Sequence, residues 1–376
     1  MLIRYLSVIV ISGLLWACID SYYPRIDDYL DLPVVEGSIT NEPGPYIIKL
    51  SRSITLDNMN LKPITGARIV ISDDSTIEET LIESERGVYT TSATGIRGEA
   101  GKKYRITIEI DSKTYQSNYE ELQEPIEIDS IYTRVEYKEI TEGPVEGLQF
   151  YIDTEVLPDN NRQFLWTFTE TYKYNSELLL DYTYFNPDSI VKNYSDTGTV
   201  CWQTEKSYAT FTCSAENFRE PKISHFPLHY INNLTNKLSE RYSVLVNQYT
   251  ISEEAYHYWN EIEKQQAESG SLYTRQPYQI SGNLKNINDP EDNILGFFMV
   301  AGVSQKRMYI DRPSLTFNYS TCSPVINLFQ NSNPYSLKYP LYAMVMESGD
   351  YAFAPRRCFA CQLNGGTLIK PDFWEK

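Results

Sequence analysis

Histidine is scarce in this sequence, with three residues among 376. The Gly-x-Ser-x-Gly and His-Glu-x-x-His motifs and the phosphate-binding loop are absent as well. Common nucleophilic and metal-dependent hydrolases depend on such groups, so we expect no enzyme activity, no catalytic residue, no metal and no cofactor. One alternative stays open, because a carboxylate pair for glycoside cleavage needs only two of the 50 acidic residues.

Basic residues are also few. The chain has 33 Lys and Arg against 50 Asp and Glu, which gives a net charge of −17 at pH 7. Nucleic-acid binding depends on a basic stripe that displaces counterions from the phosphate backbone. An acidic surface repels that backbone, so we expect no nucleic-acid partner.

The apolar run near the N-terminus is short. It extends from Leu6 to Trp16, about eleven residues, whereas a helix needs about twenty to cross the hydrocarbon core. The run follows the single cation Arg4, and this layout is typical of a secretory signal. We therefore predict a segment that is removed and not a membrane span.

The run closes with Leu15-Trp16-Ala17-Cys18. This ending resembles a bacterial lipobox, although Trp16 is bulkier than the residue usual at that place. The resemblance implies that residues 1–17 are a lipoprotein signal peptide and that Cys18 is the lipid-attachment site. Several acyl chains anchor a protein stably, so the lipid is the expected contact with the membrane. Removal of residues 1–17 leaves 32 basic against 50 acidic residues, a net charge of −18.

Residues 18–32 are acidic and lack apolar periodicity, so we predict a tether. Acidic residues close behind the lipidated cysteine resemble the surface-export signal of Bacteroidota lipoproteins, although Ser21 and Tyr22 follow Asp20 here. The resemblance implies a protein of the outer membrane that faces the exterior.

The composition favours a mainly β fold. Tyrosine is abundant, with 31 residues, and Thr, Ile and Val recur at strand-like spacing. The 359 residues after the signal peptide are more than one core usually organises, so we expect two domains. The tyrosines fit two interpretations: they cover sheet faces, or they form a wet binding surface.

We expect the first domain over residues 33–125. Its turn and strand motifs are Pro63-x-x-Gly66-Ala67, Gly87-x-Tyr89 and Gly101-x-x-Tyr104. They resemble the carboxypeptidase-regulatory-like module, which implies an Ig-like, transthyretin-type β-sandwich. The glycines are interpreted as turn residues with positive φ, in preference to a phosphate-binding loop.

An acidic, proline-marked join at residues 120–125 separates this region from a second, larger β-rich domain over residues 126–376. Strands are predicted at residues 126–132, through Val300 and Val303, and at residues 306–310, and alternating patterns predict two more at residues 147–156 and 163–174. The polar stretch 175–200 between them is a candidate binding loop. One inserted helix is expected over residues 252–269, capped by Ser252, with Ala255, Tyr258, Trp259 and Ile262 on its packing face and Gly270 at its end.

Five cysteines remain once Cys18 is lipidated, and an exported protein meets an oxidising compartment. We predict structural disulfides among Cys201, Cys322, Cys358 and Cys361, which leaves Cys213 over, and the connectivity stays open. Cys358 and Cys361 have the spacing of a redox dithiol or of half a zinc site. No second Cys-x-x-Cys accompanies them, so both alternatives are weaker.

Two further patterns point only weakly to metals. His225 and His229 would share one face of a helix, but Pro227 lies between them. Residues 286–293 are rich in oxygen ligands but lack the glycine and the closing glutamate of an EF-hand loop. We expect a strand in the first case and a solvated turn in the second.

The chain as a whole resembles an uncharacterised, DUF-type family of Bacteroidota outer-membrane lipoproteins that are often encoded beside TonB-dependent receptors. The resemblance depends on Val35-Glu36-Gly37, Gly282-Asn283, Leu295-Gly296-Phe297-Phe298, Cys358-x-x-Cys361, Gly365-Gly366-Thr367 and Lys370-Pro371-Asp372-Phe373-Trp374. It implies a non-enzymatic accessory or substrate-binding protein whose partner is a TonB-dependent receptor or another outer-membrane protein. The alternatives are a stand-alone binder of a small molecule, glycan or peptide, and a surface hydrolase.

Overall fold

The structure is a computed structural model that describes residues 31–54, 61–141, 143–156, 162–193, 199–216, 218, 222–268 and 279–375. The expected signal peptide, Cys18, most of the tether and Gly270 lie outside these residues. Among the helices of the described ranges, none has the length and apolarity needed to span a membrane.

The fold is mainly β, as predicted, and its elements form several sheets. In the first 125 residues the strands are β1 (Pro33–Thr40), β2 (Ile47–Arg52), β3 (Lys62–Pro63), β4 (Arg68–Asp73), β5 (Glu78–Thr80), β6 (Ile82–Glu85), β7 (Val88–Thr90), β8 (Lys103–Ile110), β9 (Lys113–Ser117) and β10 (Glu120–Glu121). The elements that follow are β11 (Ser130–Ile140), β12 (Gly143–Glu155), β13 (Gln163–Asn175), β14 (Tyr182–Asn186), β15 (Ser189–Lys192), β16 (Val200–Lys206), β17 (Phe211–Ser214), β18 (Lys222–Asn232), β19 (Arg241–Thr250), α2 (Glu253–Glu268), β20 (Leu284–Asn286), β21 (Leu295–Asp311), β22 (Val325–Ile326), α3 (Leu328–Asn331), β23 (Leu341–Val345) and β24 (Tyr351–Ala354).

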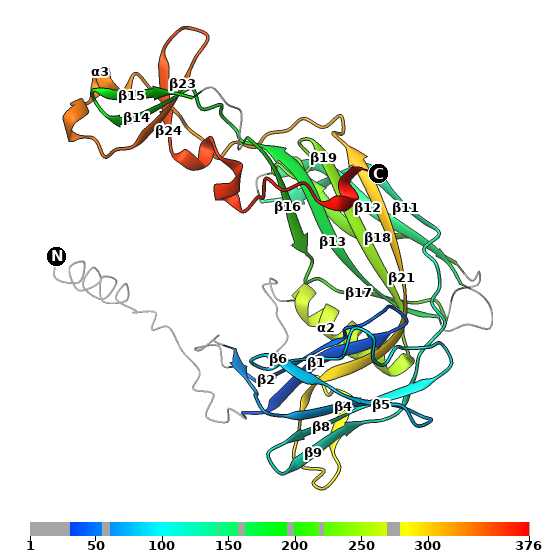
Figure 1. Cartoon of the computed structure of the whole chain (residues 1–376). Helices are drawn as coiled ribbons and strands as arrows, with labels where there is room; N and C mark the ends of the chain where they lie inside the picture. The colour runs from blue at the N-terminus through cyan, green and yellow to red at the C-terminus, as the bar shows by residue number, and fades with distance from the viewer. Residues whose placement is uncertain are drawn as a thin grey trace, which may run out of the picture.

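One long strand, β21, joins the two halves of the molecule (Figure 1). Its first residues pair in parallel with β1, from Val34↔Leu295 onward, and its later residues pair antiparallel with β19. A single 10-stranded sheet therefore extends through both halves, in the order β16-β13-β19-β21-β1-β2-β7-β6 with β17 and β3 attached. The two separate strands predicted, one through Val300 and Val303 and one at residues 306–310, are thus one strand.

The two faces of β21 explain its long apolar run. Phe298 and Val300 point into the core of the first half, whereas Phe297, Met299 and Ala301 pack on the other side beside α2. A strand buried on both faces loses the alternating pattern that a half-exposed strand shows. The continuous run 295–303 follows from this double burial.

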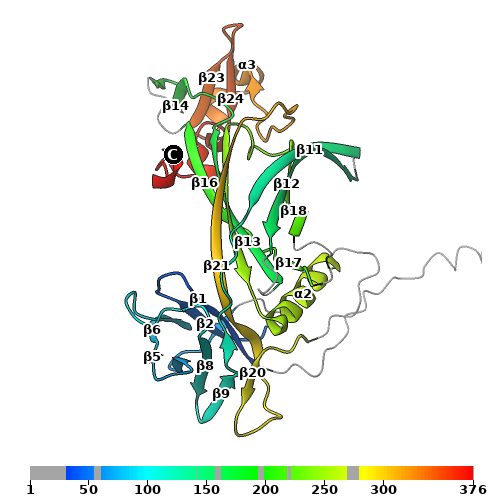
Figure 2. The same ribbon diagram turned by 90° about the vertical axis from the view of Figure 1, so that its right-hand side faces the viewer.

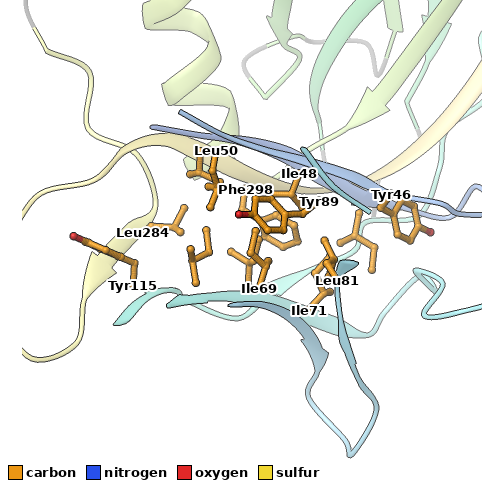
Figure 3. Close-up of a cluster of buried hydrophobic side chains, with 14 of the residues drawn as sticks. Tyr46, Ile48, Leu50, Ile69, Ile71, Leu81, Tyr89, Tyr115, Leu284 and Phe298 are labelled. Carbon is orange, nitrogen blue, oxygen red and sulfur yellow. The ribbon is translucent and has the colours of Figure 1, made fainter. Parts of the chain in front are cut away.

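The N-terminal sandwich consists of the first part of the large sheet and a 6-stranded sheet of order β20-β9-β8-β4-β5, with β10 attached to β8. Figure 3 shows Ile48 and Tyr89 of the first sheet facing Ile69 and Ile71 of the second, with Phe298 of β21 among them. All five side chains are buried. The sandwich predicted from its strand motifs is therefore present.

Residues 33–125 do not close this sandwich alone. β20 pairs with β9, and the first part of β21 pairs with β1, although both come from the region assigned to the second domain. Gly296 permits the close approach: its φ is +92°, and a Cβ there would lie 1.8 Å from the carbonyl oxygen of Val35. Asn283 adds a side-chain bridge, accepting from the amide of Phe298 at 3.0 Å and donating to its carbonyl at 2.8 Å.

The second sandwich packs the other part of the large sheet against the 3-stranded sheet β11-β12-β18 (Figure 2). Its core contains aromatic residues of β12, β13 and β19, among them Phe150, Trp166 and Tyr242. The predicted strands at 147–156 and 163–174 correspond to β12 and β13.

Helix α2 covers the face of the large sheet opposite the N-terminal core. Ser252 caps it by accepting from the amide of Ala255 at 3.1 Å, and the Tyr258 ring lies 4.9 Å from that of Phe297. The predicted helix is confirmed to within a residue at each end. Its aromatic face packs against the sheet, as a core surface does.

A small distal lobe consists of β14, β15, β22, β23, β24 and α3, at the end of the molecule opposite β8 and β9 (Figure 1). Its sheet has the order β15-β14-β23-β24-β22. The stretch 175–200, predicted as a binding loop, instead supplies the β14–β15 hairpin of this sheet. In place of the expected loop, pairing of β14 with β23, far along the chain, orders residues whose local sequence is polar, and the binding role of this stretch stays a prediction.

Candidate functional site

The outer face of the sheet β11-β12-β18 gathers tyrosines and charged side chains in one place. Residues directly opposite each other on neighbouring strands share a face. Tyr132 is opposite Tyr151, and Arg134 is opposite Gln149. On the other side, Tyr151 is opposite Pro227 and Gln149 is opposite Tyr230. These side chains point away from the core and define the tyrosine face.

Tyr132 and Tyr151 form a platform of two rings stacked on each other. Their rings stack with centroids 5.6 Å apart and planes inclined by 21°. Both hydroxyls are tied to carboxylates: Tyr132 donates to Asp153 at 3.2 Å, and Tyr151 donates to Glu136 in a short hydrogen bond. The rings are therefore held in position before any ligand arrives.

Arg134 lies over this platform as an exposed cation. Its guanidinium carbon is 5.8 Å from the centroid of Tyr132 and 5.7 Å from that of Tyr151. Its Nη2 donates to Nε2 of His225 at 2.9 Å. Within the described residues no carboxylate lies within ion-pair distance of Arg134. A guanidinium has five N–H donors, so most of its binding capacity is unused.

The carboxylates of the tyrosine face, Asp153 and Glu136, accept hydrogen bonds from the tyrosines. Burial, together with the nearby charge of Asp153, raises the pKa of Tyr132 above its usual value. The hydrogen bond to Glu136 is the main cause that raises the pKa of Tyr151. Both phenols stay protonated at neutral pH, so they keep donating to Asp153 and Glu136.

His225 closes one side of the platform in an unusual backbone conformation. Its φ is +58°, in the left-handed region that residues other than glycine rarely adopt. The register between β12 and β18 shifts between Phe150 and Tyr151 and again between Ile152 and Thr154. Such bulges redirect side chains, and here the amide of His225 donates to Asp153 at 2.7 Å.

Lys138 and Tyr230 extend the tyrosine face along the strands. The Lys138 ammonium lies 4.4 Å from the ring centroid of Tyr230 and donates to Gln149 at 2.7 Å. Tyr230 lies across Gly147, where a Cβ would come within 2.6 Å of the ring. Cations and tyrosine rings thus alternate over the length of the sheet.

A second concentration of charge lies inside the second sandwich. Lys237 bridges two glutamates, 2.5 Å from Glu170 and 2.7 Å from Glu205. Tyr242 donates to Glu170 at 2.9 Å, and Tyr172 donates to Glu205 at 2.8 Å. We call this group the Glu170 cluster.

The Glu170 cluster brings two carboxylates together, the arrangement that a glycosidase uses. Burial alone would raise the pKa of Glu170, but contacts with His229, at 3.4 Å, and with Lys237 outweigh it and lower the pKa to about 2. A carboxylate that stays ionised cannot protonate a leaving group. Glu170 and Glu205 are thus joined by Lys237 in an ionic cluster that is buried at Glu170 and partly exposed at Lys237 and Glu205.

The two histidines predicted as a weak metal pair lie on strand β18 and point to opposite sides. His225 belongs to the tyrosine face, whereas His229 lies over Phe168 in the core, with ring centroids 4.5 Å apart. No three His, Cys, Asp or Glu residues within the described ranges are grouped to hold a metal ion.

The cysteines form two long-range disulfides. Cys201 of β16 is bonded to Cys361, and Cys322 is bonded to Cys358. The Cys-x-x-Cys pair is therefore split between two bridges, which leaves no dithiol for redox chemistry. Cys213 is free, and burial raises the pKa of its thiol to about 11.

The oxygen-rich turn 286–293 satisfies its own acceptors. Asp292 accepts from Lys113 at 2.6 Å, from Tyr115 at 2.6 Å and from Asn286 at 2.7 Å. Burial opposes these hydrogen bonds, which lower the pKa of Asp292 to about 2. The turn fastens β20 to β9, and both carboxylate oxygens of Asp292 accept hydrogen bonds from these side chains.

The tyrosine face was not identified from the sequence, although its signal is visible there. Tyr132-x-Arg134-x-Glu136 and Tyr151-x-Asp153 place these residues at a spacing of two on expected strands. Only the pairing of β11 with β12 shows that the two rows are adjacent.

The ending that suggested a family is structural. Gly366 lies against Cys201, where a Cβ would be 2.6 Å from the Cys201 Cβ. Phe373 lies 3.8 Å below the guanidinium of Arg307, and Trp374 is buried beside Tyr309. Phe373 and Trp374 thus pack on side chains of β21, Gly366 packs on β16, and none of them belongs to the tyrosine face.

Comparison with known proteins gives a family but no function. No curated protein matches the chain. The family described as Domain of unknown function (DUF4249) matches residues 19–307, which is most of the sequence. That span covers the N-terminal sandwich and the tyrosine face. The chain therefore belongs to the DUF4249 family.

Proposed function

We propose that this protein is a non-enzymatic lipoprotein of the Bacteroidota outer membrane, anchored through Cys18 and facing the exterior. In this proposal it acts as an accessory or substrate-binding protein of a TonB-dependent transporter or a similar envelope complex. The main support is the tyrosine face, where the half-buried Tyr132 and Tyr151 and the exposed Arg134 form a fixed surface. Tyrosine and arginine are enriched among the residues that dominate binding energy at protein interfaces.

The course of the chain supports the orientation in this proposal. β1 and the start of β21 run in parallel, and Pro33 lies at the beginning of that pair. β1 therefore begins at the end of the N-terminal sandwich away from the second sandwich and the distal lobe (Figure 1). A lipid on Cys18 would hold the N-terminal sandwich next to the membrane and present the tyrosine face above it.

Crosslinking and affinity purification of the lipidated protein from outer membranes test the proposal. We expect recovery of a β-barrel transporter, and we expect the Tyr132→Ala/Tyr151→Ala variant to recover much less of it. Tyr208→Ala is the matched control, since Tyr208 is 90% exposed and does not belong to the tyrosine face. Recovery of no barrel protein with the unmodified chain would refute the proposal.

A further inference from the structure

A polar cavity of about 360 Å³ lies where the second sandwich joins the distal lobe. The chain passes from the sandwich to the lobe after β13 and again after β21 (Figure 1). Both passages contribute to the cavity wall, whose residues come from positions 175–178, 239–240, 312 and 319–322. Cavities of this size between two units of a fold are frequent places for small ligands. None of these residues belongs to the tyrosine face.

One buried group in the cavity wall has no partner in the protein. Ser239 is 3% exposed, and its Oγ is buried without a hydrogen-bond partner among the described residues. Buried hydroxyls in folded proteins nearly always have a partner, because an unpaired one destabilises the fold. Since Ser239 lines the cavity, a bound ligand would supply that partner.

The cavity wall also contains a cation and an acid that do not contact each other. Arg312 donates one hydrogen bond, from Nη1 to the carbonyl oxygen of Ser239 at 2.8 Å, which leaves most of its five N–H donors. Glu240 accepts from Asn175 at 3.0 Å through Oε1, while its Oε2 lies 4.0 Å from the ammonium of Lys173, too far for a hydrogen bond. Among the ion pairs of the described residues, none joins Arg312 to Glu240.

The second acid of the cavity, Glu177, already has its hydrogen-bond partners. Each of its carboxylate oxygens accepts at least two hydrogen bonds, from the hydroxyls of Ser320 and Thr321 and from the amides of Thr321 and Cys322. Partial burial raises the pKa of Glu177, but these hydrogen bonds outweigh it and lower the pKa below its usual value. Glu177 therefore adds a fixed negative charge to the cavity.

These charges restrict the chemistry of a ligand. A simple anion would meet the carboxylates of Glu177 and Glu240, a simple cation would leave the donors of Arg312 unpaired, and a neutral sugar would give neither Arg312 nor Glu240 a counterion. An α-amino acid carries both charges: a carboxylate that matches the planar fork of a guanidinium, and an ammonium that matches Glu240. Leu178 and Tyr319 supply an apolar part of the wall for its side chain.

We propose that the cavity between the second sandwich and the distal lobe binds a free α-amino acid with an apolar side chain. Arg312 and the hydroxyl of Ser239 hold its carboxylate, and Glu240 holds its ammonium. The inference goes beyond the proposed function, because it uses no residue of the tyrosine face and requires neither the lipid on Cys18 nor a transporter.

Titration calorimetry of the lipidated full-length protein in detergent tests this inference, with leucine and phenylalanine as the probes. N-acetyl-leucine lacks the ammonium, leucinamide lacks the carboxylate, and glucose lacks both charges. We expect saturable binding of at least one amino acid and at least about tenfold weaker binding of either leucine derivative, since each loses a charged hydrogen-bonded contact. No binding of either amino acid, or equal binding of glucose or of a derivative, would overturn the inference.

Variants assign the two charged contacts. Arg312→Gln is expected to weaken leucine binding by about tenfold or more and to remove its advantage over leucinamide, because the partner of the carboxylate is lost. Glu240→Gln should remove the advantage of leucine over N-acetyl-leucine for the corresponding reason. Arg86→Gln and Glu85→Gln change exposed residues of the N-terminal sandwich and are the matched controls. If either cavity variant keeps the preferences of the natural chain, the assigned contacts are wrong.

Ser239→Ala gives a test that does not depend on a charged side chain. The substitution removes a hydroxyl without a partner in the protein, so the ligand-free variant should unfold at a temperature no lower than the natural chain. Its leucine binding should be weaker by about fivefold, the equivalent of one hydrogen bond. Unchanged leucine binding in this variant would contradict the placement of the carboxylate. Recovery of a barrel transporter from membranes is a separate result, so failure of either proposal leaves the other standing.

Discussion

At the scale of single residues, the ionic groups of the second sandwich differ from surface ion pairs in how much they contribute to the free energy of unfolding. Lys237 contacts Glu170 and Glu205, and the Glu170 side chain is 7% exposed. Lys49 and Glu36 form a pair of 3.8 Å on the surface, with both side chains more than half exposed. Removal of one partner leaves a buried charge without its counterion in the first case only.

Lys237→Met should therefore lower the free energy of unfolding by about 3 kcal/mol, because Glu170 loses its closest counterion. Lys49→Met should leave it nearly unchanged, since exposed pairs contribute little. Urea unfolding of both variants measures the difference. Equal midpoints for the two variants would contradict the role assigned to the Glu170 cluster.

Glu170 also makes the free energy of unfolding depend on pH in the acidic range. Its pKa is lowered from 4.5 to about 2 in the folded protein, so the contribution of its ionised form is present above about pH 4.5 and is lost as the pH falls toward 2. At pH 7 this contribution is at most about 3 kcal/mol. The stability gap between the natural chain and Glu170→Gln, measured by thermal unfolding, should narrow between pH 4.5 and pH 2. A gap that stays constant over this interval would rule the mechanism out.

At the scale of elements, the junction between β10 and α2 contains a carboxyl group whose pKa is shifted in the direction opposite to that of Glu170. Glu120 accepts a short hydrogen bond from Ser252, the cap of α2. Burial raises the pKa of Glu120 to about 7, and the charge of Glu254 adds to the rise, while the bond from Ser252 opposes it. The folded state therefore prefers the protonated acid.

A raised pKa in the folded state means that stability is greatest below about pH 4.5 and falls as the pH rises through 7. Glu120→Gln imitates the protonated acid, so it should unfold at a higher temperature than the natural chain at pH 8. At pH 5 the two proteins should unfold at similar temperatures. Scanning calorimetry at both pH values checks this, and a larger advantage at pH 5 would reverse the assignment.

The contact between β1 and β21 depends on Gly296. A Cβ there would meet the carbonyl oxygen of Val35 at 1.8 Å, whereas Gly101, which also has a positive φ of +82°, has nothing within 4 Å. Gly296→Ala should lower the free energy of unfolding by at least about 3 kcal/mol, because the strands must separate. Gly101→Ala should cost only the backbone term, about 1 kcal/mol. Chemical denaturation compares them, and similar losses would show that the strand contact is unimportant.

At the scale of the whole molecule, the two disulfides join segments that are far apart in sequence. Cys201 and Cys361 are 160 residues apart, and Cys322 and Cys358 are 36 apart. The bridges hold the chain around the distal lobe to β16 and to the C-terminal segment. Removal of such a bridge costs about 2–5 kcal/mol in a small secreted domain.

Thiol titration of the mature protein measures this pairing. After denaturation without reductant we expect one reactive thiol, that of Cys213, because Cys18 is a thioether in the proposed lipoprotein. In the folded protein this thiol should react slowly near neutral pH, since its pKa of about 11 leaves little thiolate. Four or five free thiols would contradict both bridges.

The sequence by itself determined features that depend on neighbours along the chain. The helix beginning after Ser252 and the strands 33–40 and 163–174 follow from caps and from side-chain alternation, which act within a few residues. Composition also indicated which cysteines are free to pair, but not how they pair.

Only the tertiary structure decided which of these segments meet. In the tertiary structure β21 belongs to both sandwiches, and part of the polar stretch 175–200 forms the β14–β15 hairpin of the distal lobe. Tyr132 lies beside Tyr151 and under Arg134. The physical reason is the same in each case: strand pairing and burial join residues across tens to hundreds of positions, and no local pattern specifies that choice. The tyrosine face, on which the proposed function depends, exists only once β11 and β12 are paired.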